Sequence, residues 1–472
     1  MRAFGKKRTE VPDIVERAVV VGAGIGGLLA GRVLAESFGE VFLVERDVLP
    51  EGPDARKGVP QGRHLHSLAT RGSRILEELF PGFDAELAAA GCPLLDQAAD
   101  AVTELPAGRL PRFRSGITMR AASRGLIEER IRRRLERLPN VRFIEGREVI
   151  GLLAGEEGRV AGVRARLRGA GDHEEIGAGL VVDASGQGSR APRWLEEIGY
   201  EAPRETVVDA RLGYATRWYR VPEGFSGDWK GLAVVPGWPE GSRGGTLREV
   251  EGGLWTAVLI GLGGDYPPTD EAGFLEFARS LPSPAIHDAI SRAEPVSPVY
   301  GYRRTANRRR HYEEARIPEN FLALGDSACY LNPSYGQGMS AAALSALALR
   351  ECLDGRGVRG LARRFHRRQR RAVAPCWTAS AGSDAQWSAR SPEGLSLPRR
   401  ALHHLSGGVM RLAVEREDVA ARLLAVKNLL EPPSSLARPG VLLPALRRVL
   451  AWRAPVGRAR STEPAGASQG IE

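Results

Sequence analysis

The sequence of 472 residues predicts an α/β fold with a parallel sheet near the N-terminus, an antiparallel sheet in the middle and a helical C-terminal region. Three observations predict it. Glycine-rich strand–turn–helix segments stand far apart at Ala18–Leu34 and Phe321–Leu344. Alternating segments broken by Gly and Pro fill 198–299, and the chain after Leu361 has largely helical composition. With 43% hydrophobic residues, the chain is long enough for two packed domains.

The first glycine-rich segment has the spacing of a dinucleotide-binding turn. Ala18–Val21 is a short apolar run that predicts a buried parallel strand. Glycines follow in G-x-G-x-x-G spacing: the first makes a tight turn, the second admits a pyrophosphate, and the third lets helix pack on strand. The helical composition of Leu28–Glu36 puts the phosphates at a helix N-terminus. The residues expected there are Gly22, Ala23, Gly24, Ile25, Gly26 and Gly27.

A second strand, Val41–Val44, ends at Glu45, whose carboxylate can accept hydrogen bonds from an adenosine ribose. Leu49–His66, rich in Pro, Gly and charge, predicts a functional loop. Helices are expected within Ser67–Ala90 and Ser123–Leu138. Further strands are expected at Val141–Ile144, Val149–Leu153, Val160–Leu167 and Leu180–Asp183.

The middle of the chain predicts a sheet that would roof a substrate. Thr216–Val221, Leu232–Val235 and Trp255–Ile260 alternate, and Phe274–Leu281 interrupts them as a helix.

The downstream glycine-rich segment repeats the strand–acid pattern. Leu322–Leu324 predicts a strand, Gly325 and Asp326 stand at its end, and a Pro/Gly loop precedes the helix Met339–Leu353. A carboxylate there can hold a sugar or ribitol hydroxyl. Glycines let the chain pass beneath a planar ring, and the helix N-terminus faces negative charge at the ring edge.

Composition excludes several other classes. The four cysteines have no C-x-x-C spacing, which argues against a disulfide framework or a zinc site, so no metal is expected. The net charge of +10 is spread along the chain without a nucleic-acid motif. No segment predicts a membrane span, although a basic face could attract anionic lipid or an acidic carrier protein. We expect a cytoplasmic protein with loose ends at Met1–Glu16 and Ser461–Glu472.

With these motifs in place, the sequence resembles the FAD-dependent monooxygenases of the para-hydroxybenzoate hydroxylase superfamily, which have a glutathione-reductase-type FAD fold. Their central D-G-like motif corresponds to DASGQGSR at Asp183–Arg190, with Ala-Ser before the glycine. Within the superfamily the sequence is most similar to the squalene-epoxidase-like epoxidases of bacterial polyether biosynthesis. That finer match lies in Arg56–His66, Ala122–Arg134 and Leu331–Leu353.

The resemblance implies a role for each matching residue. Arg46 would lie on the adenine side, Arg124 at FAD phosphate or ribose, and the Val149 backbone at adenine. Arg56 and Lys57 would contact the ring or substrate. The FAD-contacting residues implied are Gly22–Gly27, Glu45, Arg46, Arg124, Val149, Asp183, Gly325, Asp326, Pro333, Gly336, Gln337, Gly338 and Met339. His64 and His66 are candidates for a catalytic base, against the commoner role of packing residues.

The resemblance also implies a reaction. FAD reduced by NADPH or NADH traps O2 as a flavin hydroperoxide, which passes one oxygen atom to an alkene of an apolar substrate such as a polyene polyketide, free or carrier-bound. Without a second dinucleotide fingerprint, a separate flavin reductase is an alternative electron source. Alternative functions are aromatic hydroxylation, prenyl-chain reduction, halogenation, or a non-enzymatic flavin or lipid scaffold. The expected segments are 17–197 and 300–353 for FAD, 198–299 for substrate, and a helical 354–460.

Overall fold

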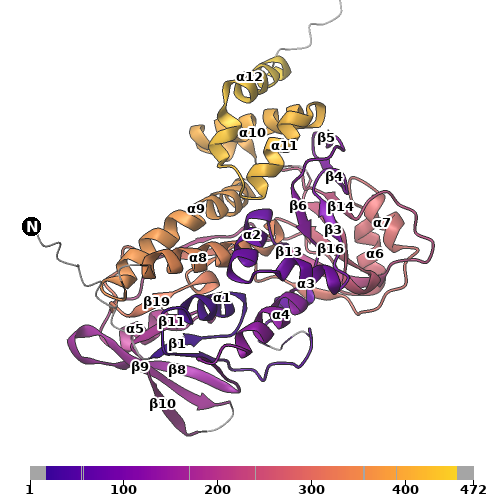
Figure 1. Ribbon diagram of the computed structural model, residues 1–472. Helices are drawn as coiled ribbons and strands as arrows, with labels where there is room; N and C mark the ends of the chain where they lie inside the picture. The colour runs from indigo at the N-terminus through magenta and orange to yellow at the C-terminus, as the bar shows by residue number, and fades with distance from the viewer. Residues whose placement is uncertain are drawn as a thin grey trace, which may run out of the picture.

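The computed structural model describes residues 17–453, apart from 55, 57, 169–170, 240, 355–356, 388 and 390. The predicted loose ends and Lys57 lie outside the described residues. The element order alternates strands and helices and ends in helices, which confirms the predicted fold class (Figure 1).

A five-stranded parallel sheet lies at the centre of the first layer. Its strand order is β19-β11-β1-β2-β7, and every neighbouring pair is parallel. The strands are β1 (Arg17–Val21), β2 (Glu40–Val44), β7 (Val141–Ile144), β11 (Leu180–Asp183) and β19 (Phe321–Ala323). The chain therefore brings the strand of its downstream glycine-rich segment, β19, back beside β11, which is itself paired with β1.

Both faces of this sheet are buried, as its continuous apolar runs require. Along β1, Ala18 and Val20 face one hydrophobic cluster while Val19 and Val21 face another. The first cluster contains helices, and the second contains a three-stranded sheet. The helices are α1 (Ile25–Leu34), α2 (Thr70–Leu79), α3 (Phe83–Ala89), α4 (Arg124–Glu136), α8 (Gly338–Leu353) and α9 (Leu361–Trp387). The strands are β8 (Arg147–Ala154), β9 (Val160–Leu167) and β10 (His173–Gly177), accompanied by α5 (Ala191–Glu197).

The second layer is a seven-stranded sheet in the order β17-β13-β16-β15-β14-β4-β5. It consists of β4 (Ala101–Leu105), β5 (Gly108–Arg109), β13 (Gly213–Arg220), β14 (Gly231–Val234), β15 (Arg243–Val250), β16 (Leu254–Gly261) and β17 (Tyr300–Tyr302). Helices α6 (Glu271–Arg279) and α7 (Ala285–Ile290) pack on one face. The smaller sheets comprise β3 (Leu94–Asp96), β6 (Thr118–Arg120), β12 (Glu205–Val208), β18 (Asn307–Arg310) and β20 (Cys329–Tyr330).

This sheet differs from the expected antiparallel sheet in one pairing, and its strands come from more than one of the expected segments. It is mixed, because β14 and β4 run parallel while its other pairings are antiparallel. Strands β4 and β5 come from within 17–197, and β17 begins just after 299, so the sheet recruits residues from both segments assigned to FAD. The division of the chain into four segments stays a prediction.

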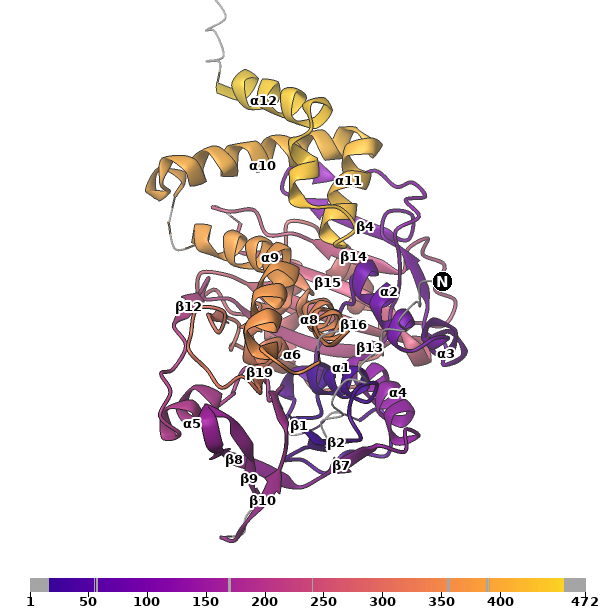
Figure 2. The ribbon, with the colours of Figure 1, turned by 60° about the vertical axis from the view of Figure 1, so that its left-hand side comes forward.

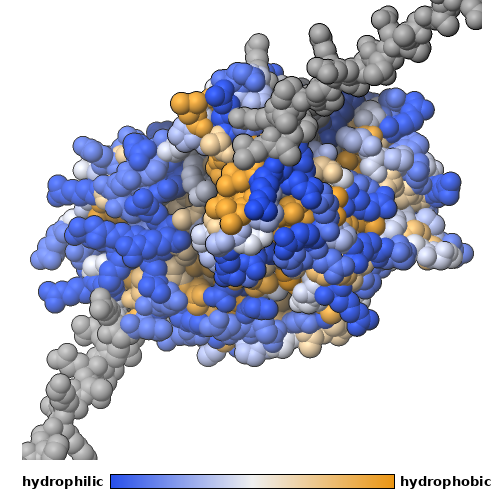
Figure 3. Space-filling view, turned by 90° about the horizontal axis from the view of Figure 1, so that it is seen from above, coloured by the Kyte–Doolittle hydropathy of each residue, from blue (hydrophilic) through white to orange (hydrophobic). Residues whose placement is uncertain are grey.

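The last helices of the chain lie above the two layers (Figures 1 and 2). Helix α9 packs on α8, and a small cluster joins α10 (Leu397–Glu415), α11 (Glu417–Lys427) and α12 (Pro439–Arg453). Looking down on these helices, Figure 3 shows apolar side chains in the middle of the face. The exposed leucines on these helices are Leu397, Leu402, Leu443 and Leu446. Among the described residues, no helix combines the length and hydropathy that crossing a membrane requires.

Candidate functional site

The two glycine-rich segments meet at one cavity of about 510 Å³, here called the main cavity. It opens at the carboxyl ends of the parallel strands, where β1 lies between β2 and β11 and the strand order changes direction. Ligands of open α/β sheets bind at this position. The predicted residues in its lining are Gly22, Gly24, Ile25, Gly26, Glu45, Arg46, His66, Arg124, Val149, Asp326, Pro333, Gly336, Gly338 and Met339.

Glycine is required at the first turn on steric grounds. Gly22 has a φ of 95°, and a Cβ there would lie 2.8 Å from the Ala184 carbonyl oxygen. At Gly27 a Cβ would lie 1.8 Å from the Gly22 carbonyl oxygen, so helix and strand approach as the fingerprint predicts. A Cβ on Gly26 would touch Leu324 at 3.4 Å, which brings the two glycine-rich segments into contact.

Glu45 organises this turn from the end of β2. Its Oε2 accepts a hydrogen bond from the Ala23 backbone N–H at 2.8 Å and forms an ion pair with Arg56 at 3.1 Å. Arg56 also pairs with Glu128 and donates to the Ala23 carbonyl oxygen. Arg56 is buried and absent from the lining of both cavities described here, which places it at the glycine turn instead of the ring or substrate.

Two helices begin at the main cavity without side-chain caps. The N-cap residues Gly24 of α1 and Gln337 of α8 make no capping hydrogen bond, and neither helix has an acidic residue in its first turn. The first N–H groups of a helix need partners from outside the helix, and its dipole favours negative charge there. This pair of N-termini suits an elongated ligand with anionic groups at two places.

Asp326 and Arg124 carry opposite charges at the same cavity. The Asp326 carboxylate has no hydrogen-bond partner among the described residues, and burial raises its pKa to about 6 against the lowering effect of Arg124. Arg124 is held by Glu128 through an ion pair of 2.8 Å. The Asp326 carboxylate is therefore available to accept hydrogen bonds from hydroxyl groups, which is the role predicted for it.

Some predicted cofactor residues do not line the main cavity. Asp183 is fully buried and accepts hydrogen bonds from Ser185 and Ser189, so it shapes its own turn. Ala23, Gly27 and Gly325 lie within the two glycine-rich segments but outside the lining of the main cavity. The predicted contact between Asp183 and the cofactor therefore stays a prediction, and the structure shows this carboxylate buried in its own turn.

A smaller cavity of about 130 Å³, here called the distal cavity, adjoins the main one and has Gln337 in its lining. The residues common to both linings are Leu65, Ser67, Tyr214, Pro333 and Gly336. Its sheet side consists of Ala233, Thr246, Arg248, Val258 and Ile260. The seven-stranded sheet therefore roofs this cavity, in the position expected for a substrate.

The two histidines proposed as a base are tied into the protein. His64 Nδ1 lies 2.7 Å from Thr216 Oγ1, and His66 Nδ1 lies 2.9 Å from the His64 carbonyl oxygen. Burial lowers the pKa of His64 to about 4 and that of His66 to about 3. Both are neutral, weak bases at pH 7, which favours a packing role.

Comparison with known proteins shows the family to which the chain belongs. No family model matches it. Protein Rv3254 of Mycobacterium tuberculosis is 33% identical over 392 residues, which span 80% of this chain and 82% of that protein. The chain belongs to the family of Protein Rv3254.

More distant relatives of this family member carry names that describe oxygen chemistry. Squalene epoxidase 5 of Arabidopsis thaliana is 31% identical over 222 residues, 45% of this chain and 40% of that protein. Kynurenine 3-monooxygenase of Salinispora arenicola is 26% identical over 364 residues, 74% of each chain. The similarity to squalene epoxidases is therefore real but distant.

Solved structures confirm the fold. The flavin-dependent brominase Bmp2 aligns with a TM-score of 0.63 at 15% identity, over 92% of this chain and 99% of that one. This family member thus has the fold of flavin-dependent monooxygenases and halogenases.

Sequence reasoning missed a buried carboxylate that holds the Pro/Gly loop in this family member. Asp384, in α9, accepts hydrogen bonds from Asn307 and Asn332 at 2.6 and 2.8 Å, and from the Tyr335 hydroxyl at 2.6 Å. Asn307 Oδ1 in turn accepts from Ser380. No local motif marks Asp384, since its partners lie 49 to 77 residues away.

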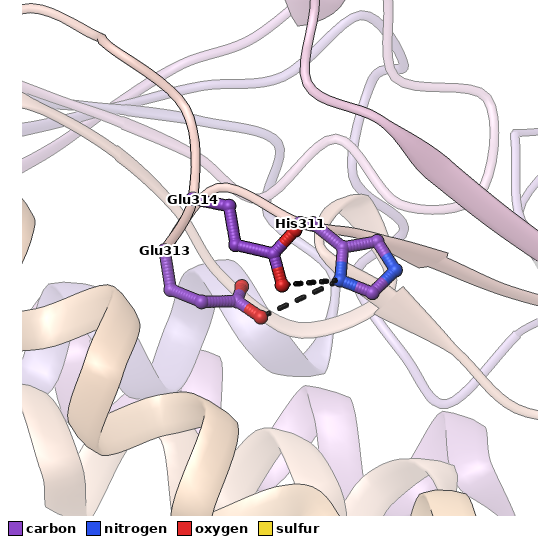
Figure 4. A group of neighbouring side chains, drawn as sticks. All are labelled: His311, Glu313 and Glu314. Atoms are coloured by element: carbon purple, nitrogen blue, oxygen red, sulfur yellow. Dashed lines mark ion pairs between the residues drawn. The ribbon is translucent and has the colours of Figure 1, made fainter.

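One acidic cluster outside the cavities has an ordinary explanation. His311, Glu313 and Glu314 gather closely enough to suggest a metal site (Figure 4). Glu314 pairs with Arg204 at 2.8 Å, and Glu313 pairs with Arg309 and Arg370. These arginines already neutralise the carboxylates, so the cluster is an ion-pair network.

Proposed function

We propose that this chain is an FAD-dependent monooxygenase that transfers one oxygen atom from O2 to an organic substrate, with NADPH or NADH as electron donor. One observation carries the proposal: two uncapped helix N-termini, one from each glycine-rich segment, open onto a single cavity with an unpaired carboxylate. The cavity volume of about 510 Å³ is in the ordinary range for cofactor sites.

The residues present fit FAD in charge and shape. The N-terminus of α1 would hold the pyrophosphate, with Glu45 on the adenosine ribose and Asp326 on the ribitol. Arg124 supports this orientation, because it lines the main cavity and a Cβ on Gly24 would lie 3.7 Å from its Nη2. A phosphate at Gly24 would accept hydrogen bonds from this guanidinium.

Bound FAD supplies the oxygen activation and the electron transfer. The protein's own residues position and protect the chemistry. Pro333 and Gly336 would lie against the ring, and the α8 N-terminus would stabilise negative charge at the ring edge. The neutral aromatic walls around His64, namely Tyr214 at 4.8 Å and Tyr302 at 5.7 Å between ring centroids, exclude water from the substrate side.

The shape of the distal cavity favours a compact substrate. A long polyene needs a long apolar tunnel, whereas 130 Å³ suits a single ring or one end of a chain. Aromatic hydroxylation is therefore the function that the geometry supports best. Epoxidation of a polyene is the second candidate, favoured by the similarity to a plant squalene epoxidase.

Halogenation receives less support. The fold is shared with a brominase, but Trp229, Trp238 and Trp255 do not form the W-x-W-x-I-P-like segment typical of flavin halogenases.

We infer a cytoplasmic enzyme, since all four cysteines are free and buried. Electron supply by a separate flavin reductase is tested together with the donor preference below.

The reaction is tested with ¹⁸O2. FAD-loaded protein is supplied with NADPH or NADH, with and without a flavin reductase, and offered simple phenols and linear polyenes. The proposal expects a product that carries one ¹⁸O atom, as a hydroxyl on a ring or as an epoxide. Reduced products without ¹⁸O would instead indicate a reductase, and label found only in peroxide with both substrate classes would count against monooxygenation.

A further inference from the structure

The distal cavity contains two cationic side chains and no carboxylate. Arg248 stands on β15, with Thr246 two residues earlier on the same face of the strand. Lys427 is the last residue of α11 and enters the cavity from the C-terminal helices. Neither the sheet nor the helix alone would create a charged pocket; their packing does.

Neither cation has an acidic partner among the residues that the structure describes. Arg248 donates a hydrogen bond of 2.6 Å to the Ser67 hydroxyl, and no carboxylate forms an ion pair with it or with Lys427. The contrast on the same strand is clear, since Arg243 pairs with Asp265 at 2.7 Å. Arg248 is half-buried, and an arginine that is largely withdrawn from water usually has a counter-charge.

The surroundings of the two cations explain their electrostatic state. Burial lowers the pKa of Arg248 to about 10, and burial followed by repulsion from Arg248 lowers the pKa of Lys427. Lys427 itself is an exposed residue that borders the distal cavity. The helix dipole of α11 favours a lysine at its end, but it does not explain the unpaired arginine opposite.

We propose that Arg248 and Lys427 bind the carboxylate of a compact organic acid, which is the substrate of the proposed monooxygenase. An anion between them relieves the repulsion and forms charge-assisted hydrogen bonds with a planar guanidinium and an ammonium. Because Ser67 and Pro333 border both cavities, the acid's other end points toward the site proposed for the flavin ring. This proposal rests on the proposed function, and it replaces the expected apolar substrate with an acidic one.

The probes for the test are benzoate and hexanoate, each with its neutral amide, and inorganic phosphate. Binding to FAD-loaded protein is measured by calorimetry for wild type and for three variants. Lys427→Met removes the charge, Lys427→Arg keeps it, and Lys230→Met is a matched control because Lys230 pairs with Asp100 outside the cavity. We expect at least one carboxylate to bind ten- to a hundredfold more tightly than its amide, about the effect of one charged hydrogen bond.

Lys427→Met is expected to reduce that preference to less than threefold, whereas Lys427→Arg and Lys230→Met preserve it. Equal binding of every acid and amide, a preference unchanged in Lys427→Met, or tighter binding of phosphate than of either acid would overturn the proposal. FAD uptake is measured separately by gel filtration. A carboxylate preference without FAD uptake would contradict the proposed monooxygenase but support the carboxylate site. FAD uptake without the preference would support the flavin site but contradict the carboxylate site.

Discussion

The buried Asp326 carboxylate lowers the stability of the ligand-free protein at neutral pH and is available to bind a ligand. Its carboxylate faces the main cavity without a partner among the described residues, and burial raises its pKa from 3.8 to about 6. The folded protein therefore holds this proton more tightly than the unfolded chain does. The stability that the group contributes is fully present below pH 4 and is lost as the pH rises through about 6.

Asp326→Asn should consequently stabilise the FAD-free protein at pH 7 by about 1–2 kcal/mol, because the amide carries no charge to bury. The same change should weaken FAD binding roughly tenfold, since a carboxylate is the stronger hydroxyl acceptor. Urea unfolding at pH 4 and pH 7, together with an FAD titration, measures both effects. A variant less stable than wild type at pH 7, with unchanged FAD affinity, would show that Asp326 is a structural residue.

Elements distant in sequence hold the predicted ring loop in place. Helix α9 contributes Asp384, whose carboxylate accepts hydrogen bonds from Asn307, Asn332 and Tyr335. This side chain is fully buried, and burial raises its pKa. Deleting one member of a satisfied buried network leaves its partners without acceptors.

For Asp384→Ala we expect a loss of roughly 3 kcal/mol in the free energy of unfolding and a broadened flavin absorption spectrum, because the loop would no longer be fixed. Asp418→Ala is the control, since Asp418 is exposed and pairs with Arg416 in the first turn of α11, so its removal should change stability by less than about 1 kcal/mol. Equal effects of the two substitutions in denaturant unfolding would show that the Asp384 network does not stabilise the loop.

How far the sequence could predict these elements depends on where their signals lie. The glycine turn, Glu45 and the α8 loop carry local spacing, and the structure brings them to one cavity as expected. Strand β15 escaped prediction because Gly244 and Gly245 interrupt its alternation, and with it Arg248 was missed. Lys427 belongs to a helix that has no motif, so only its packing against the sheet reveals its position.

Across the whole molecule, several histidines are buried in the neutral form. Burial lowers the pKa of His64 to about 4 and the pKa values of His66 and His366 to about 3. Unfolded histidines bind protons below about pH 6.5. Their stabilising effect is therefore complete above that pH and is lost as the pH falls toward 4.

Acid should thus destabilise the protein by roughly 1–2 kcal/mol per histidine between pH 7 and 5. His366→Gln removes one such group, while the glutamine can still accept the hydrogen bond that Ala323 N–H gives to His366 at 3.1 Å. We expect a smaller loss of stability over this pH interval, measured by denaturant unfolding at both values. A loss identical to that of wild type would assign the acid sensitivity to other groups.

The central claim concerns the meeting of two distant glycine-rich segments around one flavin. An equilibrium titration of FAD with the purified protein, followed by flavin fluorescence, tests it most directly. We expect saturable binding of one FAD per chain, weakened by Asp326→Asn. Fluorescence of FAD that stays unchanged at every protein concentration would contradict it.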